Sequence, residues 1–224
     1  MIKQPPRVII FIGVPGSGKG TQAKLLAASS GYTHISTGEL LRKLQTNPHT
    51  SPEDQTLLLA MKRGEKVADE LIYRLAFAAI QTIVAQGGGV ILDGAIRSRE
   101  QAIAYQAFFT ELGLADRVVA VLLHITDDDS RMRLQTRKMC RECGHSIVAT
   151  KENETQTTCD ICGGTLFVRE DDTPEAIEQR IHDQGNEATQ PIVDYYTELG
   201  TLLTIDASKS VESVSLDLRQ QVDC

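Results

Sequence analysis

The chain has 224 residues, enough for one large domain with its own core, and carries a net charge of −7 with a pI near 5.3. Aromatic residues make up only 4% and tryptophan is absent, so the chain lacks the basic face and stacking rings of a typical nucleic-acid-binding protein. No apolar run reaches membrane-spanning length, and no separate targeting segment precedes the first strand pattern. We therefore expect a monomeric cytoplasmic protein with no nucleic-acid or membrane partner.

An apolar run over 8–12 is followed at once by a loop rich in glycine. The run is short and rich in β-branched residues, which predicts a strand buried on both faces. Gly13 is followed, after four residues, by Gly18 and Lys19, the P-loop pattern whose backbone N–H groups and lysine hold phosphate. Unlike the common pattern, Gly20 follows the lysine and the hydroxyl residue, Thr21, comes next. A merely flexible loop is the alternative, but the flanking strand and helix patterns favour phosphate binding.

Three helical patterns follow the loop. Apolar spacing predicts a helix over 22–30, ended by Gly31. A short extended segment then leads to a second helix, in which Ser36 and Glu39 form a capping box. A third helix begins at Pro52, so that a small helical insertion separates the elements of the core.

An apolar strand over 90–93 ends in Asp93. It comes after a long helix over 70–86, which Asp69 caps. A carboxylate at the end of a strand downstream of a P-loop is placed to order the water shell of a magnesium ion bound to nucleotide phosphates. The alternative is an aspartate that only terminates a strand.

A cationic helix is predicted after a buried strand over 118–125. Thr126 caps this helix, which is predicted to run toward Met139. Arg133 and Arg137 are four residues apart, so their guanidinium groups should project from one helix face. Like charges at this spacing repel, so either an anionic ligand meets them or the face is an ordinary solvated one.

Two CxxC pairs follow. Cys140 and Cys143 form the first, Cys159 and Cys162 the second, and glycine follows each pair. In a reducing compartment this spacing predicts a tetrahedral four-thiolate zinc site rather than disulfides. His145 is an alternative ligand. Four protein ligands leave no position open for substrate, so the zinc should be structural.

The C-terminal part completes an α/β pattern. Thr173 and Pro174 predict the start of a helix that should kink or restart at Pro191. A last strand over 202–206 and a last helix over 211–222 follow. Alternating strands and helices of this kind predict a parallel sheet covered by helices.

The chain resembles the adenylate kinase family, in its long bacterial form with a zinc-bearing lid. The segments that carry the likeness are GVPGSGKGTQ (13–22), HISTGELLR (34–42), LDGAIRSREQA (92–102), RLQTRKMC (133–140) and REDD (169–172). The resemblance implies a P-loop nucleoside monophosphate kinase fold, with a parallel sheet that has helices on both faces. It also implies a single domain over 1–224, with a helical AMP-binding insertion at 37–68 and a zinc-ribbon lid at 133–170.

The resemblance further implies a reaction and its residues. The γ-phosphoryl group of ATP, bound with Mg²⁺, is transferred reversibly to AMP and gives two ADP, and Zn²⁺ is structural. The implied catalytic residues are Lys19, Asp93, Arg97, Arg133, Arg137, Arg169 and Arg180. The implied ATP site comprises Gly16, Ser17, Gly18, Lys19, Gly20, Thr21, Arg133, Arg137 and Lys209. The implied AMP site comprises Thr37, Arg42, Val67, Gly94, Arg97, Gln101, Arg169 and Arg180, with Gln101 bonded to adenine. The implied zinc ligands are Cys140, Cys143, Cys159 and Cys162.

Two positions depart from the family pattern. Ala95 and Ile96 stand where Phe-Pro is usual, which predicts weaker AMP binding or looser base selection. Thr136 stands where glycine usually separates the lid arginines, which could alter the rate of closure. The alternatives to adenylate kinase are a kinase of another monophosphate, a nucleotide sensor without turnover, and a zinc-ribbon nucleic-acid binder.

Overall fold

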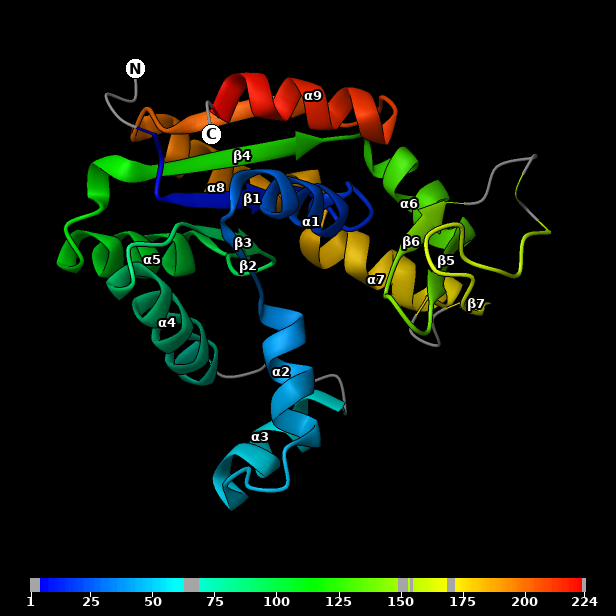
Figure 1. The fold of residues 1–224 in the computed structure, drawn as a ribbon, viewed down its shortest axis with the longest axis horizontal. Helices are drawn as coiled ribbons and strands as arrows, with labels where there is room; N and C mark the ends of the chain where they lie inside the picture. Colours follow the sequence, from blue (N-terminus) through cyan, green and yellow to red (C-terminus); the bar gives the residue numbers. More distant parts are fainter. Residues whose placement is uncertain (1–4, 63–68, 149–152, 154, 169–171, 223–224) are drawn as a thin grey trace.

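A five-stranded parallel sheet forms the centre of the protein, which a computed structural model describes over residues 5–62, 69–148, 153, 155–168 and 172–222 (Figure 1). Its strands are β1 (Val8–Ile12), β2 (Thr33–Ser36), β3 (Val90–Asp93), β4 (Val118–His124) and β8 (Leu202–Asp206). They lie in the order β2-β3-β1-β4-β8, and every pairing is parallel. The carboxyl ends of all five strands therefore meet at one edge, where α/β sheets bind ligands.

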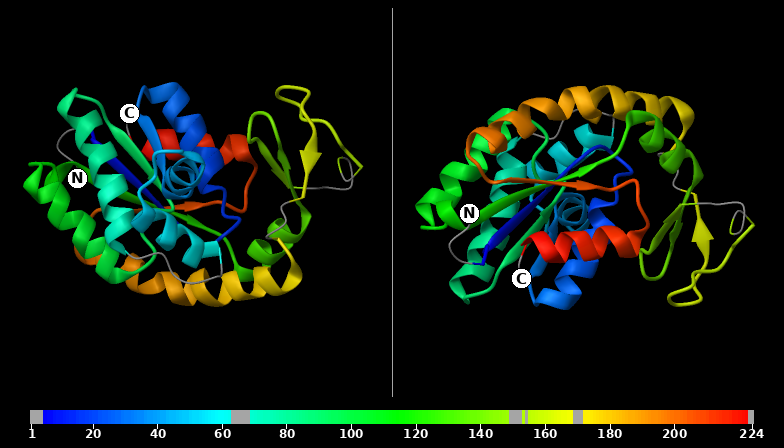
Figure 2. Two further views of the ribbon diagram at one scale, coloured as in Figure 1. Left: turned by 90° about the horizontal axis from the view of Figure 1, so that it is seen from below. Right: turned by 90° about the horizontal axis from the view of Figure 1, so that it is seen from above.

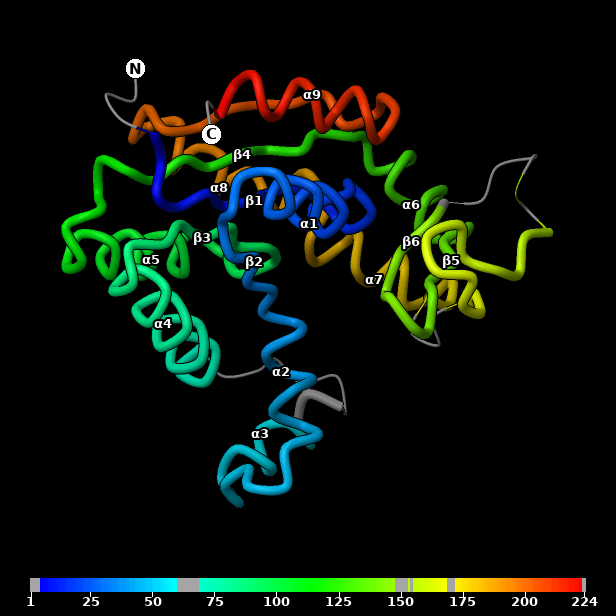
Figure 3. The backbone as a smooth tube through the Cα atoms, viewed as in Figure 1, coloured from blue at the N-terminus to red at the C-terminus, as the bar shows by residue number. Residues whose placement is uncertain are grey.

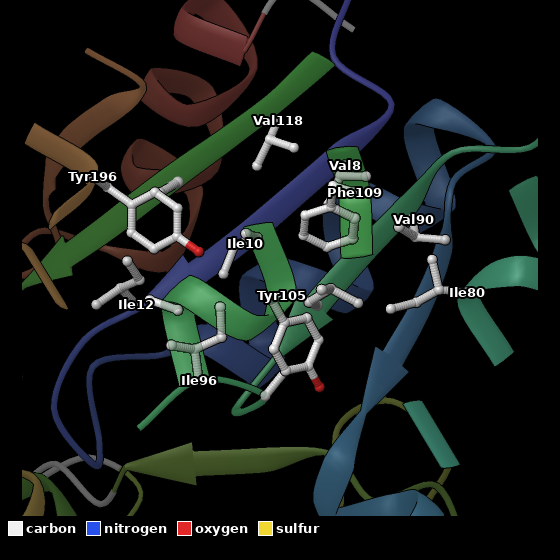
Figure 4. Packing of buried hydrophobic residues seen from close by; sticks show 14 of the residues in the cluster. Val8, Ile10, Ile12, Ile80, Val90, Ile96, Tyr105, Phe109, Val118 and Tyr196 are labelled. Atoms are coloured by element: carbon white, nitrogen blue, oxygen red, sulfur yellow. The ribbon is translucent and has the colours of Figure 1, made fainter. Parts of the chain in front are cut away.

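Helices cover both faces of this sheet (Figure 2). One face carries α4 (Asp69–Ala85), α5 (Arg99–Glu111) and α8 (Asn186–Glu198), and the other carries α1 (Lys19–Ser30) and α9 (Val211–Val222). Ile10 and Ile12 point into the first core, beside Tyr105 and Tyr196 (Figure 4), while Phe11 points into the second. The predicted α/β fold, with a central strand buried on both sides, is confirmed.

Helix α1 begins earlier than the predicted 22–30. It starts at Lys19, because the preceding Gly18 adopts a left-handed conformation (φ 93°) that turns the loop directly into the helix. Gly31 ends it with φ 74°, as predicted. The lysine of the P-loop thus lies in the first turn of the helix, where free N–H groups gather.

The helical insertion projects from the sheet below β2 (Figure 1). It consists of α2 (Thr37–Thr46) and α3 (Pro52–Lys62), and Leu41 and Leu58 pack with Leu71 of α4 in a small separate core. The predicted capping box is wrong. Ser36 precedes α2, but its side chain caps nothing within the described residues, because Ser36 ends β2 and lines the pocket described below.

A second excursion leaves the sheet after β4, at the other end of the molecule (Figure 3). It consists of α6 (Asp127–Thr136), an antiparallel sheet of β5 (Arg137–Cys140), β6 (Ser146–Val148) and β7 (Leu166–Phe167), and the returning α7 (Pro174–Gln184). A short helical turn, η1 (Ala115–Arg117), precedes β4 and is not part of this excursion. We call β5, β6, β7 and their loops the ribbon. Thr126 caps α6 as predicted, accepting from the backbone N–H of Asp129.

Two predicted helix ends are wrong. Helix α6 stops at Thr136, because the next residues pair as β5 with strands on either side, so Arg133 and Arg137 do not share a helix face. The break predicted at Pro191 lies at Gly185 instead, and Pro191 sits within α8. A side-chain carbon at Gly185 would lie 2.3 Å from the carbonyl oxygen of Ile181, which explains the glycine at this corner. Within the part of the chain that the structure describes, no helix combines the length and apolarity needed to cross a bilayer.

Candidate active site

The P-loop folds around the ammonium group of Lys19. Nζ donates to the carbonyl oxygens of Gly13 and Val14 at 2.6 and 2.8 Å. Gly13 (φ 145°) allows this turn, since a side-chain carbon there would lie 2.6 Å from the carbonyl oxygen of Leu123 in β4. Gly16 and Gly18 also have positive φ angles, so the loop turns as a phosphate-binding concavity requires.

Gly20, the departure from the common P-loop pattern, has a steric explanation. A side-chain carbon at this position would lie 3.2 Å from Oδ2 of Asp93, at the end of the neighbouring strand β3. Glycine therefore lets the carboxylate approach the first turn of α1. A single half-buried carboxylate beside a phosphate loop fits the coordination habit of Mg²⁺, which keeps most of its water and binds few protein carboxylates.

One pocket joins the P-loop to the segment after β3. It is lined by Phe11, Ile12, Gly13, Lys19, Ser36, Gly38, Arg42, Asp93, Gly94, Ile96, Arg97, Gln184, Ala188, Thr189 and Ile192. The structure thus brings together Lys19, Asp93, Gly94, Arg97 and Arg42 from the predicted set. Cations from three different elements face one space, which is what two negatively charged phosphate groups would need.

Two polar side chains of the predicted AMP site, those of Thr37 and Gln101, are buried. Thr37 is buried, and its Oγ1 has no hydrogen-bond partner within the described residues. Gln101 is also buried, and its amide bonds to the backbone N–H of Arg97 and to the carboxylate of Asp69. Gln101 does not line the pocket itself but stands directly behind Arg97 through this bond.

Burial first, and neighbouring positive charge second, disfavour the charged forms of two cations of the pocket. Burial lowers the pKa of Lys19 to about 8, against the opposing pull of Asp93, and the nearby Arg97 and Arg137 lower it further. The pKa of Arg97 is also lowered, first by burial and then, against the influence of Asp93, by Arg180. An anion bound here would relieve both effects, so the electrostatics favour phosphate.

The cations around the ribbon have protein partners. Arg137 pairs with Asp172 through two guanidinium nitrogens at 2.7 to 3.0 Å, and Arg180 Nη1 reaches the same carboxylate at 2.8 Å. The carboxylate of Asp172 is wholly buried. Arg133 instead donates to the carbonyl oxygen of Ala207, at 2.8 Å, in the loop that follows β8. None of these three arginines lines the pocket among the described residues.

The other predicted site residues lie in the P-loop and α1, after β8, or outside the described residues. Ser17 is buried in the P-loop and Thr21 is half-buried in α1. Lys209 follows β8 and its Nζ pairs with Asp217 at 2.8 Å. Arg169 and Val67 lie outside the described residues.

Two groups of residues at the site were given no role by the sequence analysis. His34 Nε2 lies 3.6 Å from Oδ2 of Asp93 and fills the edge between β2 and β3. Thr189 and Ile192 of α8 complete the pocket wall. Only the pairing of β2 with β3 and the break at Gly185 bring these residues to the site, and neither can be read from local sequence.

The four cysteines form a compact cluster in the ribbon. Their Sγ atoms all lie within 4.8 Å of one another, with Cys140 and Cys162 at 3.4 Å and Cys143 and Cys159 at 3.7 Å. Tetrahedral zinc thiolates, with bonds of about 2.3 Å, place sulfur atoms about 3.8 Å apart, so the cluster fits zinc. The backbone N–H of His145 is the main cause that lowers the pKa of Cys143 to about 7.

A P-loop, a parallel sheet and a cation-lined pocket define a P-loop kinase of nucleoside monophosphates. Residues 11–201 match the family model described as "Adenylate kinase". The chain therefore belongs to the adenylate kinase family. Its enzymatic class is ATP:AMP phosphotransferase, which acts on ATP, AMP and ADP and uses Mg²⁺ with ATP.

Curated relatives named adenylate kinase match along nearly the whole chain. The one from Halobacterium salinarum is 34% identical over 96% of this chain and 96% of its own length. Those from Methanosarcina acetivorans and Lactococcus lactis subsp. cremoris are 36% and 33% identical, over 94% and 95% of this chain and 96% and 98% of their own lengths. The likeness thus includes the segments of both excursions.

Proposed function

We propose that this chain transfers the γ-phosphoryl group of ATP to AMP at the pocket between the P-loop and the segment after β3. The observation that carries the proposal is the convergence of Lys19, Asp93 and Arg97 on one space, which Arg42 also lines. ATP phosphates would lie on the P-loop N–H groups and Lys19, and the AMP phosphate against Arg97 and Arg42. Gly16, Ser17, Gly18, Gly20 and Thr21 would complete the ATP phosphate site.

The chemistry follows from the charges. A phosphate oxygen of AMP, anionic at neutral pH, forms a bond to the γ-phosphorus while the bond from that phosphorus to the β-bridging oxygen breaks, and two ADP result. No strong general base is needed, so the task is to overcome repulsion between two anions. Mg²⁺, when bound, would neutralise charge on the ATP phosphates, and Asp93 is the carboxylate placed to hold its water. Lys19 and Arg97 would stabilise charge on the group in transfer.

The arginines of the ribbon side would complete this ring of charge on closure. Arg137 and Arg180 share the carboxylate of Asp172, and both act electrostatically on the pocket cations. We propose that residues 133–170 act as a lid, which brings Arg133, Arg137, Arg169 and Arg180 to the phosphates and excludes water. Residues 37–68 would serve as the AMP-binding insertion. The loop with Lys209 would contact the adenine of ATP.

On the AMP side, Thr37, Val67, Gly94 and Gln101 would surround the nucleoside. The buried hydroxyl of Thr37, without a partner among the described residues, supports this assignment. Ile96 contributes an apolar wall where the family has a stiffer, aromatic turn, which favours weaker selection of the base over loss of the reaction.

We propose a structural Zn²⁺ on Cys140, Cys143, Cys159 and Cys162. Reduced thiols of this kind suit the cytoplasm, and the net charge of −7 suits a protein without nucleic-acid partners. We also propose that the protein acts as a monomer.

Replacing Lys19 by Met should lower kcat about a hundredfold or more, because the phosphate cation is lost. Arg97→Ala should lower kcat/KM for AMP by a similar factor. The measurement is a coupled assay of ADP formation. Lys24→Met on the exposed face of α1, and Arg99→Ala, whose guanidinium pairs with Glu198 at the surface, are matched controls that should change rates less than twofold.

The same assay with AMP, GMP, CMP and UMP as acceptors tests the base preference. AMP should be the best acceptor. Near-normal ADP formation by Lys19→Met would show that the proposed site is wrong, and tight ATP binding without turnover would favour the sensor alternative.

A further inference from the structure

The side-chain amide of Gln101 is held at both ends by partners that act in one sense only. Its Oε1 accepts from the backbone N–H of Arg97 at 2.7 Å, and its Nε2 donates to Oδ1 of Asp69, also at 2.7 Å. A backbone N–H only donates, and a carboxylate only accepts. The orientation of the amide is therefore dictated by its partners, because a half-turn would set donor against donor and acceptor against acceptor.

Among the described residues, each end of the amide keeps one unused hydrogen-bonding position. A primary amide has two N–H donors and an oxygen with two lone pairs, and the contacts to Arg97 and Asp69 take one of each. The remaining acceptor beside a remaining donor matches adenine, which offers a 6-amino donor beside the N1 acceptor. Hypoxanthine offers the reverse order, an O6 acceptor beside an N1–H donor, and would need the flipped amide.

We propose that Asp69 is a specificity-determining positioning residue that fixes the Gln101 amide to read a 6-amino purine and to reject a 6-oxo purine. This inference rests on the proposed function, in which the base of the bound monophosphate contacts Gln101 beside the pocket lining rather than within it. Asp69 itself touches Gln101 and not the nucleotide. As the first residue of α4, it ties the end of the helical insertion to the start of α5.

The placement of Asp69 makes it a clean site for substitution. Its side chain is exposed apart from the bond to Gln101, so a change there removes little packing. Asn has the same shape but an amide that can either donate or accept, so Asp69→Asn offers the facing end of Gln101 a partner in both orientations and leaves only the backbone N–H of Arg97 to oppose a flip. Glu70→Gln is the matched control, because Glu70 is equally exposed in the same turn and makes no hydrogen bond to Gln101 in the described part of the chain.

The experiment compares kcat/KM for AMP and inosine monophosphate, with Mg-ATP as donor. Asp69→Asn should lower the AMP-to-inosine-monophosphate preference by about tenfold, chiefly through a lower KM for inosine monophosphate. Glu70→Gln should keep the preference of the unchanged protein. Unaltered thermal melting of both variants would show that the fold is retained.

Further outcomes separate this inference from the proposed function. Gln101→Leu should abolish most of the preference. If it does and Asp69→Asn leaves the preference unchanged, or lowers both activities equally, Asp69 does not fix the amide and the inference is overturned. If Gln101→Leu also keeps the preference, Gln101 does not read the base, and both the inference and that part of the proposed AMP site are wrong.

Discussion

The cations at the edge of the central sheet and those beside the ribbon are positioned by different physics. Lys19 and Arg97 lie in the segments that come after the buried strands β1 and β3, and both line one pocket. Arg137 and Arg180 are instead held by one buried carboxylate, Asp172, away from the pocket lining among the described residues. The first set already lines the pocket, and in that sense the sheet edge is preorganised, although Lys19 also donates to the carbonyl oxygens of Gly13 and Val14. The second set would have to leave Asp172 to reach a phosphate in the pocket.

The two regions also differ in what keeps them folded. Every residue of β1 is buried between two apolar cores. In the ribbon, the described core consists of Cys140, Cys159 and Leu166 with Ile147 packed against them. So small an apolar cluster offsets little of the ordering entropy of the ribbon, and we infer that the proposed zinc supplies the remaining stability there.

The largest effect that we expect is from removal of the proposed zinc, which should unfold the ribbon and leave the central sheet folded. Cys143→Ser deletes one of four ligands at an exposed position, and structural zinc is worth on the order of 10 kcal/mol. Hydrogen exchange should show lost protection in β5 and β7 and unchanged protection in β1. Bound zinc, measured per chain, should fall below one.

Cys224→Ser, at the cysteine outside the two pairs, is the control and should leave zinc content and exchange unchanged. Full protection of β5 after chelation of zinc would show that the ribbon is held by its own contacts.

The next largest effect concerns Asp172. Its replacement by Ala leaves two guanidinium groups without their shared carboxylate, and should lower the free energy of unfolding by about 2–4 kcal/mol. Urea unfolding measures the loss. The control is Asp183→Ala, at an exposed aspartate of helix α7, which begins two residues after Asp172, and it should cost less than about 0.5 kcal/mol.

Asp172→Asn sharpens the same comparison, since it keeps the shape and removes only the charge. If the arginines of the ribbon side serve the phosphates, this variant should change KM for ATP through Arg137 and KM for AMP through Arg180. Unchanged values of both constants would mean that these two arginines do not reach the phosphates.

The sequence motifs predicted the strand and the glycine-rich loop at the edge of the central sheet. They did not predict elements that form only by pairing with distant segments. The strand over 8–12 and the glycines around Lys19 can be predicted from the local sequence, because burial on both faces and positive φ angles allow few residue types. The strand at Arg137 does not, since β5 exists only through its pairing with β6 and β7.

The same distinction applies to the site. The pattern indicated Asp93 as the carboxylate at the end of a strand, and the structure places it in the pocket. The sequence predicts Asp69 only as a helix cap and includes His34 only in the segment HISTGELLR. It does not predict their contacts with Gln101 and Asp93, because these contacts join elements that are distant in sequence or adjacent only in the sheet.

The smallest expected effect is a proton taken up at the preorganised edge. The pKa of Lys19, about 8, lies below its usual 10.5 because of burial, so at pH 8.5 about three quarters of the side chain is neutral. A bound triphosphate should raise this pKa, and ATP binding should then take up a substantial fraction of one proton. Calorimetry at pH 8.5 in two buffers of different ionisation enthalpy measures that fraction.

The lowered pKa of Lys19 also makes stability and proton uptake depend on pH. Between about pH 8 and 10.5 the unfolded chain binds more protons at Lys19 than the folded one, so the contribution of this residue to stability improves as pH rises through that window. Below pH 7 the side chain is already protonated, so ATP binding at pH 6.5 should take up almost no proton at Lys19. Lys19→Met should abolish the uptake at pH 8.5, while Lys24→Met, at an exposed position of the same helix, should keep it. Equal uptake in both variants would assign the proton to another group, and the sheet edge would then hold its lysine charged before the nucleotide arrives.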